Sequence, residues 1–181
     1  MEITSPAKKF TAMTILLLIS IVTIVGYTLA VIRSNDGIPY SISETYYKLM
    51  HPYWFWGAMS VTALTILMPM VEAGSQGSIP AAIAAVVGML MVGAAPNFRD
   101  KFEGSIHIFG AVLCLGMSQL WVLANQPLVL YLWMAWWIYT IIYMARHITD
   151  DSWHDFVASK PMFWAEVTAL ATTYLTILIC L

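Results

Sequence analysis

The sequence predicts an all-α polytopic membrane protein, a bundle of six transmembrane helices forming a single integral membrane domain over residues 1–181. Hydrophobic residues make up 60% of the chain and charged residues only 10%, which leaves too little polar surface for a water-soluble globule. A helix needs roughly 20 apolar residues to cross the hydrocarbon, and apolar runs of about this length occur six times. Most of the charged residues lie in short segments between these runs.

The predicted spans cover almost the whole chain. They run over residues 10–32, 53–71, 80–95, 106–124, 127–145 and 161–181. The first is longer than the core of a signal peptide and lacks a small-residue cleavage pattern before Arg33, so we expect it to be retained. Proline stands at the start of four predicted helices: Pro52, Pro80, Pro127 and Pro161. It is tolerated there because the first-turn N–H has no helical partner.

Small residues mark one face of the third span and one face of the fourth. The third carries Gly88 and Gly93 together with several alanines, and the fourth carries Gly110, Cys114 and Ser118 at four-residue spacing. Small side chains let two helices approach closely inside a membrane. We therefore expect the third span to sit centrally, with the fourth as a candidate partner.

The polar segments of residues 33–52, 97–107 and 146–160 connect odd-numbered spans to even-numbered ones, so they share one side of the membrane. All four histidines lie in them or at their edges. The basic residues are also unequal between the two sides: Arg33, Lys48, Arg99, Lys101, Arg146 and Lys160 against Lys8 and Lys9. The positive-inside rule then predicts that the histidine-bearing face is cytoplasmic, with both termini outside.

Composition also bears on partners. The two cysteines, Cys114 and Cys180, lie in apolar sequence and indicate neither a disulfide framework nor a CxxC metal site. A formal charge of −2 without a Lys/Arg cluster argues against nucleic acid as a partner. Membrane lipid is the expected partner, and a homo- or hetero-oligomer is compatible with the sequence.

A histidine and aspartate cluster follows the fifth span. If one helix ran through it, His147, Asp151 and His154 would share a face, and His107 starts the fourth span on the same side. Three protein ligands with an open position are typical of catalytic zinc. His107, His147, Asp151 and His154 are therefore candidate zinc ligands. The alternative is that Ser152 and Asp155 only cap a short interfacial helix.

A second polar cluster precedes the second span. Its hydroxyls, ring and carboxylate could bind a lipid headgroup, which makes Ser41, Ser43, Tyr46, Tyr47 and His51 candidate binding residues and Glu44 a candidate catalytic proton carrier. Ser41 and Glu44 also match the capping box, in which two side chains satisfy backbone donors at a helix start.

Glu166 is the carboxylate that the sequence places inside a span, about 7.5 Å along the helix from Pro161. A carboxylate in the membrane is costly and is by default a candidate functional residue that needs a partner. We expect it to face the bundle, with His107, Arg146 or His147 as that partner. The alternatives are a catalytic proton carrier and a structural glutamate that holds two helices together.

Short motifs add a resemblance. Residues Pro39-Tyr40-Ser41-Ile42-Ser43 follow the first span, Gly93-Ala94-Ala95-Pro96-Asn97 close the third, and His107 comes soon after. This pattern resembles small membrane families with about six spans, of the DRAM and post-GPI-attachment-remodelling type, and their uncharacterised bacterial relatives. The resemblance implies lipid or lipid-anchor handling and assigns no role to the cluster from His147 to Asp155.

Three functions follow as expectations. The first is a lipid-directed, metal-assisted hydrolase with a polar vestibule on the histidine-bearing face. The second is a non-enzymatic lipid-binding or accessory membrane protein. The third is a small transporter that uses Glu166.

Overall fold

The computed structural model describes residues 6–35, 37–147 and 152–181, and no strand occurs among them. The predicted all-α class is confirmed. The α-helices are α1 (Pro6–Ser34), α2 (Tyr53–Ala73), α3 (Ile79–Ala94), α4 (Lys101–Asn125), α5 (Leu132–Arg146), α6 (Ser152–Ala158) and α7 (Pro161–Cys180). Three short 3-10 helices join them: η1 (Ser43–Lys48), η2 (Gln76–Ser78) and η3 (Pro127–Tyr131).

Within the described residues, six helical stretches are long and apolar enough to cross a membrane, over residues 7–34, 53–73, 76–94, 101–125, 127–146 and 161–180. They match the six predicted spans to within a few residues, which supports an integral membrane location. Helix α6, with seven residues, is too short to be a span.

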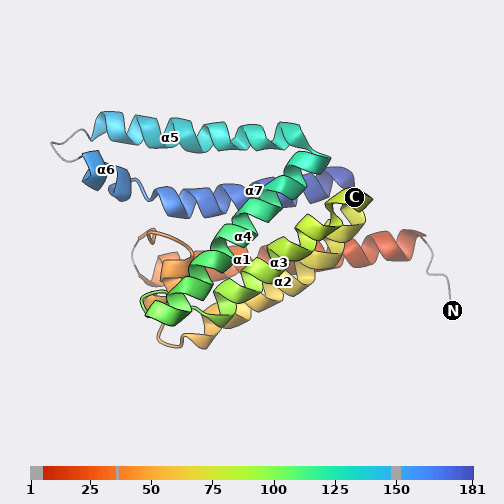
Figure 1. Cartoon of the computed structure of the whole chain (residues 1–181), viewed down its shortest axis with the longest axis horizontal. Coiled ribbons are helices and arrows are strands. Elements are labelled where there is room, and N and C mark those ends of the chain that lie inside the picture. Colours follow the sequence, from red (N-terminus) through yellow and green to blue (C-terminus); the bar gives the residue numbers. More distant parts are fainter. Residues whose placement is uncertain (1–5, 36, 148–151) are drawn as a thin grey trace.

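Successive spans run in opposite directions, so the segments between α1 and α2, α3 and α4, and α5 and α7 lie at one end of the molecule (Figure 1). We call this the polar end. Hydrogen bonds hold the polar end together: Tyr47 Oη donates to Asn97 Oδ1 at 3.0 Å and accepts from Arg99 N at 2.9 Å. Phe163 N, in the first turn of α7, donates to Tyr40 O at 2.9 Å. At the opposite end, Lys9 Nζ lies 2.6 Å from Glu72 Oε1.

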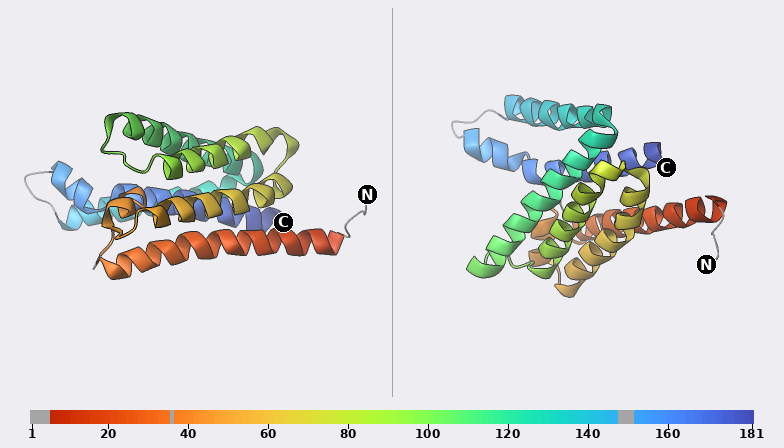
Figure 2. Two further views of the ribbon diagram at one scale, coloured as in Figure 1. Left: turned by 90° about the horizontal axis from the view of Figure 1, so that it is seen from below. Right: turned by 45° about the vertical axis from the view of Figure 1, so that its right-hand side comes forward.

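Helices α3 and α4 lie side by side and form the closest helix pair of the bundle (Figures 1 and 2). A Cβ atom added to Gly88 would lie 2.5 Å from Cys114 N and 2.6 Å from Gly110 O. One added to Gly110 would lie 2.9 Å from Gly88 O. The two backbones therefore touch through glycine, as the small-residue pattern predicts.

The start of α4 is fixed by Asp100, whose Oδ1 accepts hydrogen bonds from Phe102 N at 2.8 Å and Glu103 N at 2.9 Å. This is the usual N-cap arrangement, which satisfies otherwise unpaired first-turn donors. These backbone N–H groups lower the pKa of the exposed Asp100 carboxyl below its ordinary value.

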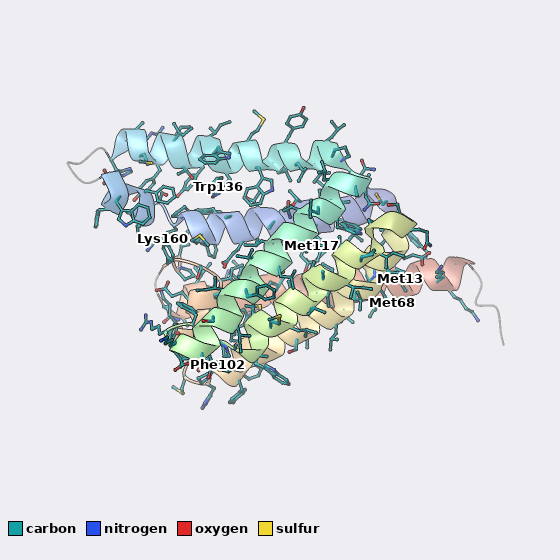
Figure 3. The ribbon with its side chains drawn as sticks, viewed as in Figure 1. Met13, Met68, Phe102, Met117, Trp136 and Lys160 are labelled. Carbon is teal, nitrogen blue, oxygen red and sulfur yellow. The ribbon has the colours of Figure 1, made fainter. Side chains whose placement is uncertain are left out.

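Helix α5 stands on the outside of the bundle beside α7 (Figure 1). Two indoles attach it: Trp136 Nε1 donates to Pro161 O at 3.0 Å, and Trp133 Nε1 donates to Gln119 Oε1 at 2.9 Å. Trp136 lies in the space between α5 and α7 in Figure 3. Large apolar side chains such as Trp137 and Ile141 are exposed on α5, as suits a helix surrounded by lipid.

The sequence places His147, Asp151 and His154 on one face only if the helix of the fifth span continues beyond its predicted end. Helix α5 ends at Arg146, and His147 leaves helical geometry with φ −123° and ψ 39°. A new helix, α6, begins at Ser152, as the alternative interpretation of the Ser152 to Asp155 pattern proposed. Asp151 lies outside the described residues.

Candidate functional site

Glu166 points into the bundle, as expected for a carboxylate within a span. Its Oε2 atom accepts a hydrogen bond from Ile42 N at 2.5 Å. The partner is thus a backbone amide of the segment before η1, and none of the three expected partners, His107, Arg146 and His147, forms a hydrogen bond or ion pair with it. Sequence reasoning missed this partner because a backbone N–H is present at every position.

The segment from Tyr40 to Thr45 is held against the start of α7 by its own polar groups. Tyr40 O accepts from Phe163 N, which is one of the first-turn donors of α7 that lack a helical partner. Glu44 Oε2 accepts from Tyr40 N at 2.6 Å, and Ser41 Oγ accepts from Glu44 N at 3.0 Å. This reciprocal arrangement resembles a capping box, so Ser41 and Glu44 shape the loop that presents Ile42 and Ser43 to Glu166.

A small cavity, here called the inner cavity, adjoins Glu166 and has a volume of about 90 Å³. Residues of α1, α2, α3, α4, α7 and the start of η1 line it, and most are apolar. Its polar side chains include Ser43, Cys114, Ser118 and Glu166. The volume exceeds the 10–15 Å³ that one water needs but is well below the roughly 300 Å³ of a typical ligand pocket.

The polar atoms of the inner cavity fall into two groups. Ser118 Oγ is satisfied by Leu115 O at 3.0 Å. Among the described residues, Glu166 Oε1 and Ser43 Oγ have no hydrogen-bond partner, although Ser43 is only 8% exposed. Neither atom is among the fully buried unpartnered side-chain atoms of the described residues, so both remain accessible to a small polar group. Glu166 and Ser43 therefore offer unused hydrogen-bonding capacity inside the membrane-spanning region.

A larger and almost wholly apolar space, here called the outer groove, lies between α1 and α7 and has a volume of about 350 Å³. Tyr174 lies on its wall, and its Oη forms a hydrogen bond of 2.7 Å with Ser20 Oγ that joins the two helices. Ile24, Ile42 and Leu170 line both the outer groove and the inner cavity. Single side chains thus separate a space of ligand size from the free polar atoms of Glu166 and Ser43.

Aromatic packing occupies the polar end, where the sequence predicted a vestibule. Tyr46 and Tyr47 contact each other with ring centroids 5.0 Å apart, and Tyr47 contacts Phe98 at 4.9 Å. The Arg99 guanidinium lies 4.2 Å from the Tyr47 ring centroid, as in a cation–π contact. Tyr47 therefore ties η1 to the segment between α3 and α4, while Tyr46 contacts Phe55 of α2 with ring centroids 6.1 Å apart.

The candidate zinc ligands do not come together in the described part of the chain, where no group of three or more His, Cys, Asp or Glu residues could hold a metal ion. His107 is 4% exposed, and its Nδ1 lies 2.9 Å from Ala95 O, so this nitrogen carries the hydrogen. His147 stacks on Tyr143 at the exposed end of α5, and His154 is exposed on α6. His51 is likewise exposed and stacks on Tyr53.

Gln119 is a polar residue that sequence reasoning passed over. Its Oε1 accepts from Trp133 Nε1 at 2.9 Å and from Thr172 Oγ1 at 3.0 Å, and its Nε2 donates to Ala169 O at 3.3 Å. One amide thus joins α4, α5 and α7. The signal was available, because an amide inside an apolar span normally seeks interhelical partners.

Comparison with models of protein families, with curated proteins and with solved structures finds no match for this chain. The resemblance to the DRAM and post-GPI-attachment-remodelling type therefore stays a prediction.

Proposed function

We propose that this integral membrane protein binds a membrane lipid, with a hydrocarbon chain of the lipid in the outer groove. The observation that carries the proposal is the groove itself, because its volume of about 350 Å³ falls in the range of ligand pockets. Both walls belong to helices apolar enough to span a membrane, so the surrounding medium is lipid hydrocarbon. The occupant that this setting supplies is a lipid chain.

The proposal favours the lipid-binding expectation over the hydrolase. Metal-assisted hydrolysis needs converging ligands around an ion with an open position, and among the described residues no group of three or more His, Cys, Asp or Glu could hold a metal ion. The free polar atoms of Glu166 and Ser43 instead belong to the inner cavity, which shares Ile24, Ile42 and Leu170 with the outer groove, and there they can hold a polar part of a bound lipid.

A bulky residue in the groove tests the proposal. Ala171 lines the groove and is exposed on α7, so Ala171→Trp should fill the space while leaving the helix intact. Ala30, exposed on α1 outside the groove lining, provides the matched control Ala30→Trp. Lipid retained through detergent purification would be quantified by mass spectrometry. The proposal requires retention by the wild type and Ala30→Trp and loss in Ala171→Trp; equal retention by all three would refute it.

We also propose that the polar end faces the cytoplasm. The excess of Lys and Arg at this end supports the orientation, and the pairing of Lys9 with Glu72 offsets one of the few basic charges at the opposite end. A membrane-impermeant maleimide applied to intact cells should label Ser75→Cys and spare Asn35→Cys. The reverse pattern would invert the topology. The wild type is the blank, because Cys114 and Cys180 lie in apolar helices.

A further inference from the structure

We infer that the bound lipid is an uncharged lipid whose polar head is a hydroxyl group, and that this hydroxyl binds Glu166 and Ser43 in the inner cavity. The inference rests on the proposed function and names the class of lipid. It starts from the two free polar atoms, Glu166 Oε1 and Ser43 Oγ, which line one cavity.

Hydrogen-bond chemistry selects the head group. The free carboxyl oxygen of Glu166 can accept a hydrogen bond, whereas a serine hydroxyl both donates and accepts. An alcohol satisfies both groups at once, since its O–H donates to Glu166 and its oxygen accepts from Ser43. Both positions are fixed from outside the cavity, because Ile42 N holds Glu166 Oε2 and the Ser41–Glu44 pair shapes the loop that carries Ser43.

Size excludes large heads. The inner cavity holds about 90 Å³, which accommodates a hydroxyl and the first carbons of a chain but not a phosphocholine or a sugar. The outer groove holds about 350 Å³ and can take the rest of the chain. Because Ile24, Ile42 and Leu170 border both spaces, rotation of these side chains joins them.

Charge excludes anionic heads. Among the described residues, no Lys, Arg or His lines either space, so an ionised phosphate would be buried there without a compensating cation. Burying an unpaired charge is costly. A lipid alcohol avoids this cost and retains the hydrogen bonds.

The experiment uses two photoreactive probes with the same chain, hexadecanol and hexadecyl phosphate, each with a diazirine in mid-chain. The purified full-length protein in detergent is irradiated with each probe, labelling is quantified by intact mass, and labelled peptides are located. The alcohol should label α1 and α7 and reach half-saturation at a concentration at least about tenfold lower than the phosphate does.

Three variants connect this preference to the site. Ser43→Ala and Glu166→Gln should each raise the half-saturating concentration of the alcohol roughly three- to tenfold, as expected for one lost or impaired hydrogen bond. Glu166→Gln keeps an oxygen for Ile42 N. Ser118→Ala is the matched control, because the Ser118 hydroxyl lines the same cavity but is already bonded to Leu115 O.

The outcomes separate the two proposals. If both probes label α1 and α7 equally in the wild type, or if Ser118→Ala weakens alcohol binding as much as Ser43→Ala does, the alcohol inference is wrong while lipid binding stands. If neither probe labels these helices, the proposed function fails with it. Alcohol and phosphate labelling are compared on the wild-type protein alone, so this test can contradict the inference even if a variant misfolds.

Discussion

Helices α3 and α4 touch backbone to backbone, whereas α1 and α7 share few contacts and leave the outer groove between them. The difference follows side-chain size. Gly88 and Gly110 face each other in the first pair, while Ile24, Leu29 and Leu170 stand at the second. In a membrane no hydrophobic effect drives helices together, so close packing requires small residues. One pair of helices is therefore packed backbone to backbone, whereas the other leaves open space between its helices.

The largest effect is expected where the backbones touch. Gly88→Ala would place a Cβ atom 2.5 Å from Cys114 N and 2.6 Å from Gly110 O, and a helix backbone cannot move away cheaply. We expect a loss of about 3 kcal/mol in the free energy of unfolding, at the upper end for overpacked sites. Unfolding in mixed micelles would measure it.

The matched control for this substitution is Gly116→Ala on α4, where an added Cβ atom meets nothing within 4 Å. Equal losses in Gly88→Ala and Gly116→Ala would show that glycine contact does not hold α3 against α4.

A smaller effect is expected where α1 meets α7. Tyr174→Phe removes the hydroxyl that bonds Ser20 Oγ at 2.7 Å, while Ser20 keeps its bond to Thr62 O. The expected loss is about 1 kcal/mol, the net value of one hydrogen bond. Spin labels on α1 and α7 should also report a broader distance distribution. An unchanged distribution together with unchanged stability would mean that this bond does not set the width of the groove.

Replacing a glycine on α1 by alanine should raise the free energy of unfolding, not lower it. An added Cβ atom on Gly26 meets nothing within 4 Å, so Gly26→Ala should stabilise the protein by about 0.5–1 kcal/mol through helix propensity. The lipid content of the purified protein should not change. Destabilisation of the size seen at Gly88 would contradict the contrast between the two helix pairs.

The smallest effect concerns pH at the start of α4. Because folding lowers the pKa of Asp100, the stabilisation from this cap is present above the unfolded pKa and is lost as pH falls through the folded value. Amide exchange of the first turn of α4, corrected for its intrinsic pH dependence, should then show reduced protection in acid. Asp100→Asn should abolish this pH dependence, since asparagine caps without titrating; persistence in the variant would assign it to another group.

The spans, the helix starts and the close contact of α3 with α4 can all be predicted from the sequence. Six apolar runs of the length of a bilayer, proline at helix starts and glycine facing glycine each act locally or between neighbouring helices, so their consequences can be predicted without coordinates. The same reasoning placed Glu166 in the interior, because an unpaired carboxylate in lipid is too costly.

The surroundings of Glu166 depend on the tertiary structure and could not be predicted from the sequence. Glu166 accepts its hydrogen bond from the backbone N–H of Ile42 and not from a histidine. The loop that folds over the start of α7 is selected by packing between segments 124 positions apart in the chain. The described histidines share one end of the bundle, but sharing an end does not by itself bring side chains together, and no group of three or more His, Cys, Asp or Glu could hold a metal ion among the described residues. The inner cavity and the outer groove arise from gaps between helices that are distant in sequence, and residue spacing carries no record of such gaps.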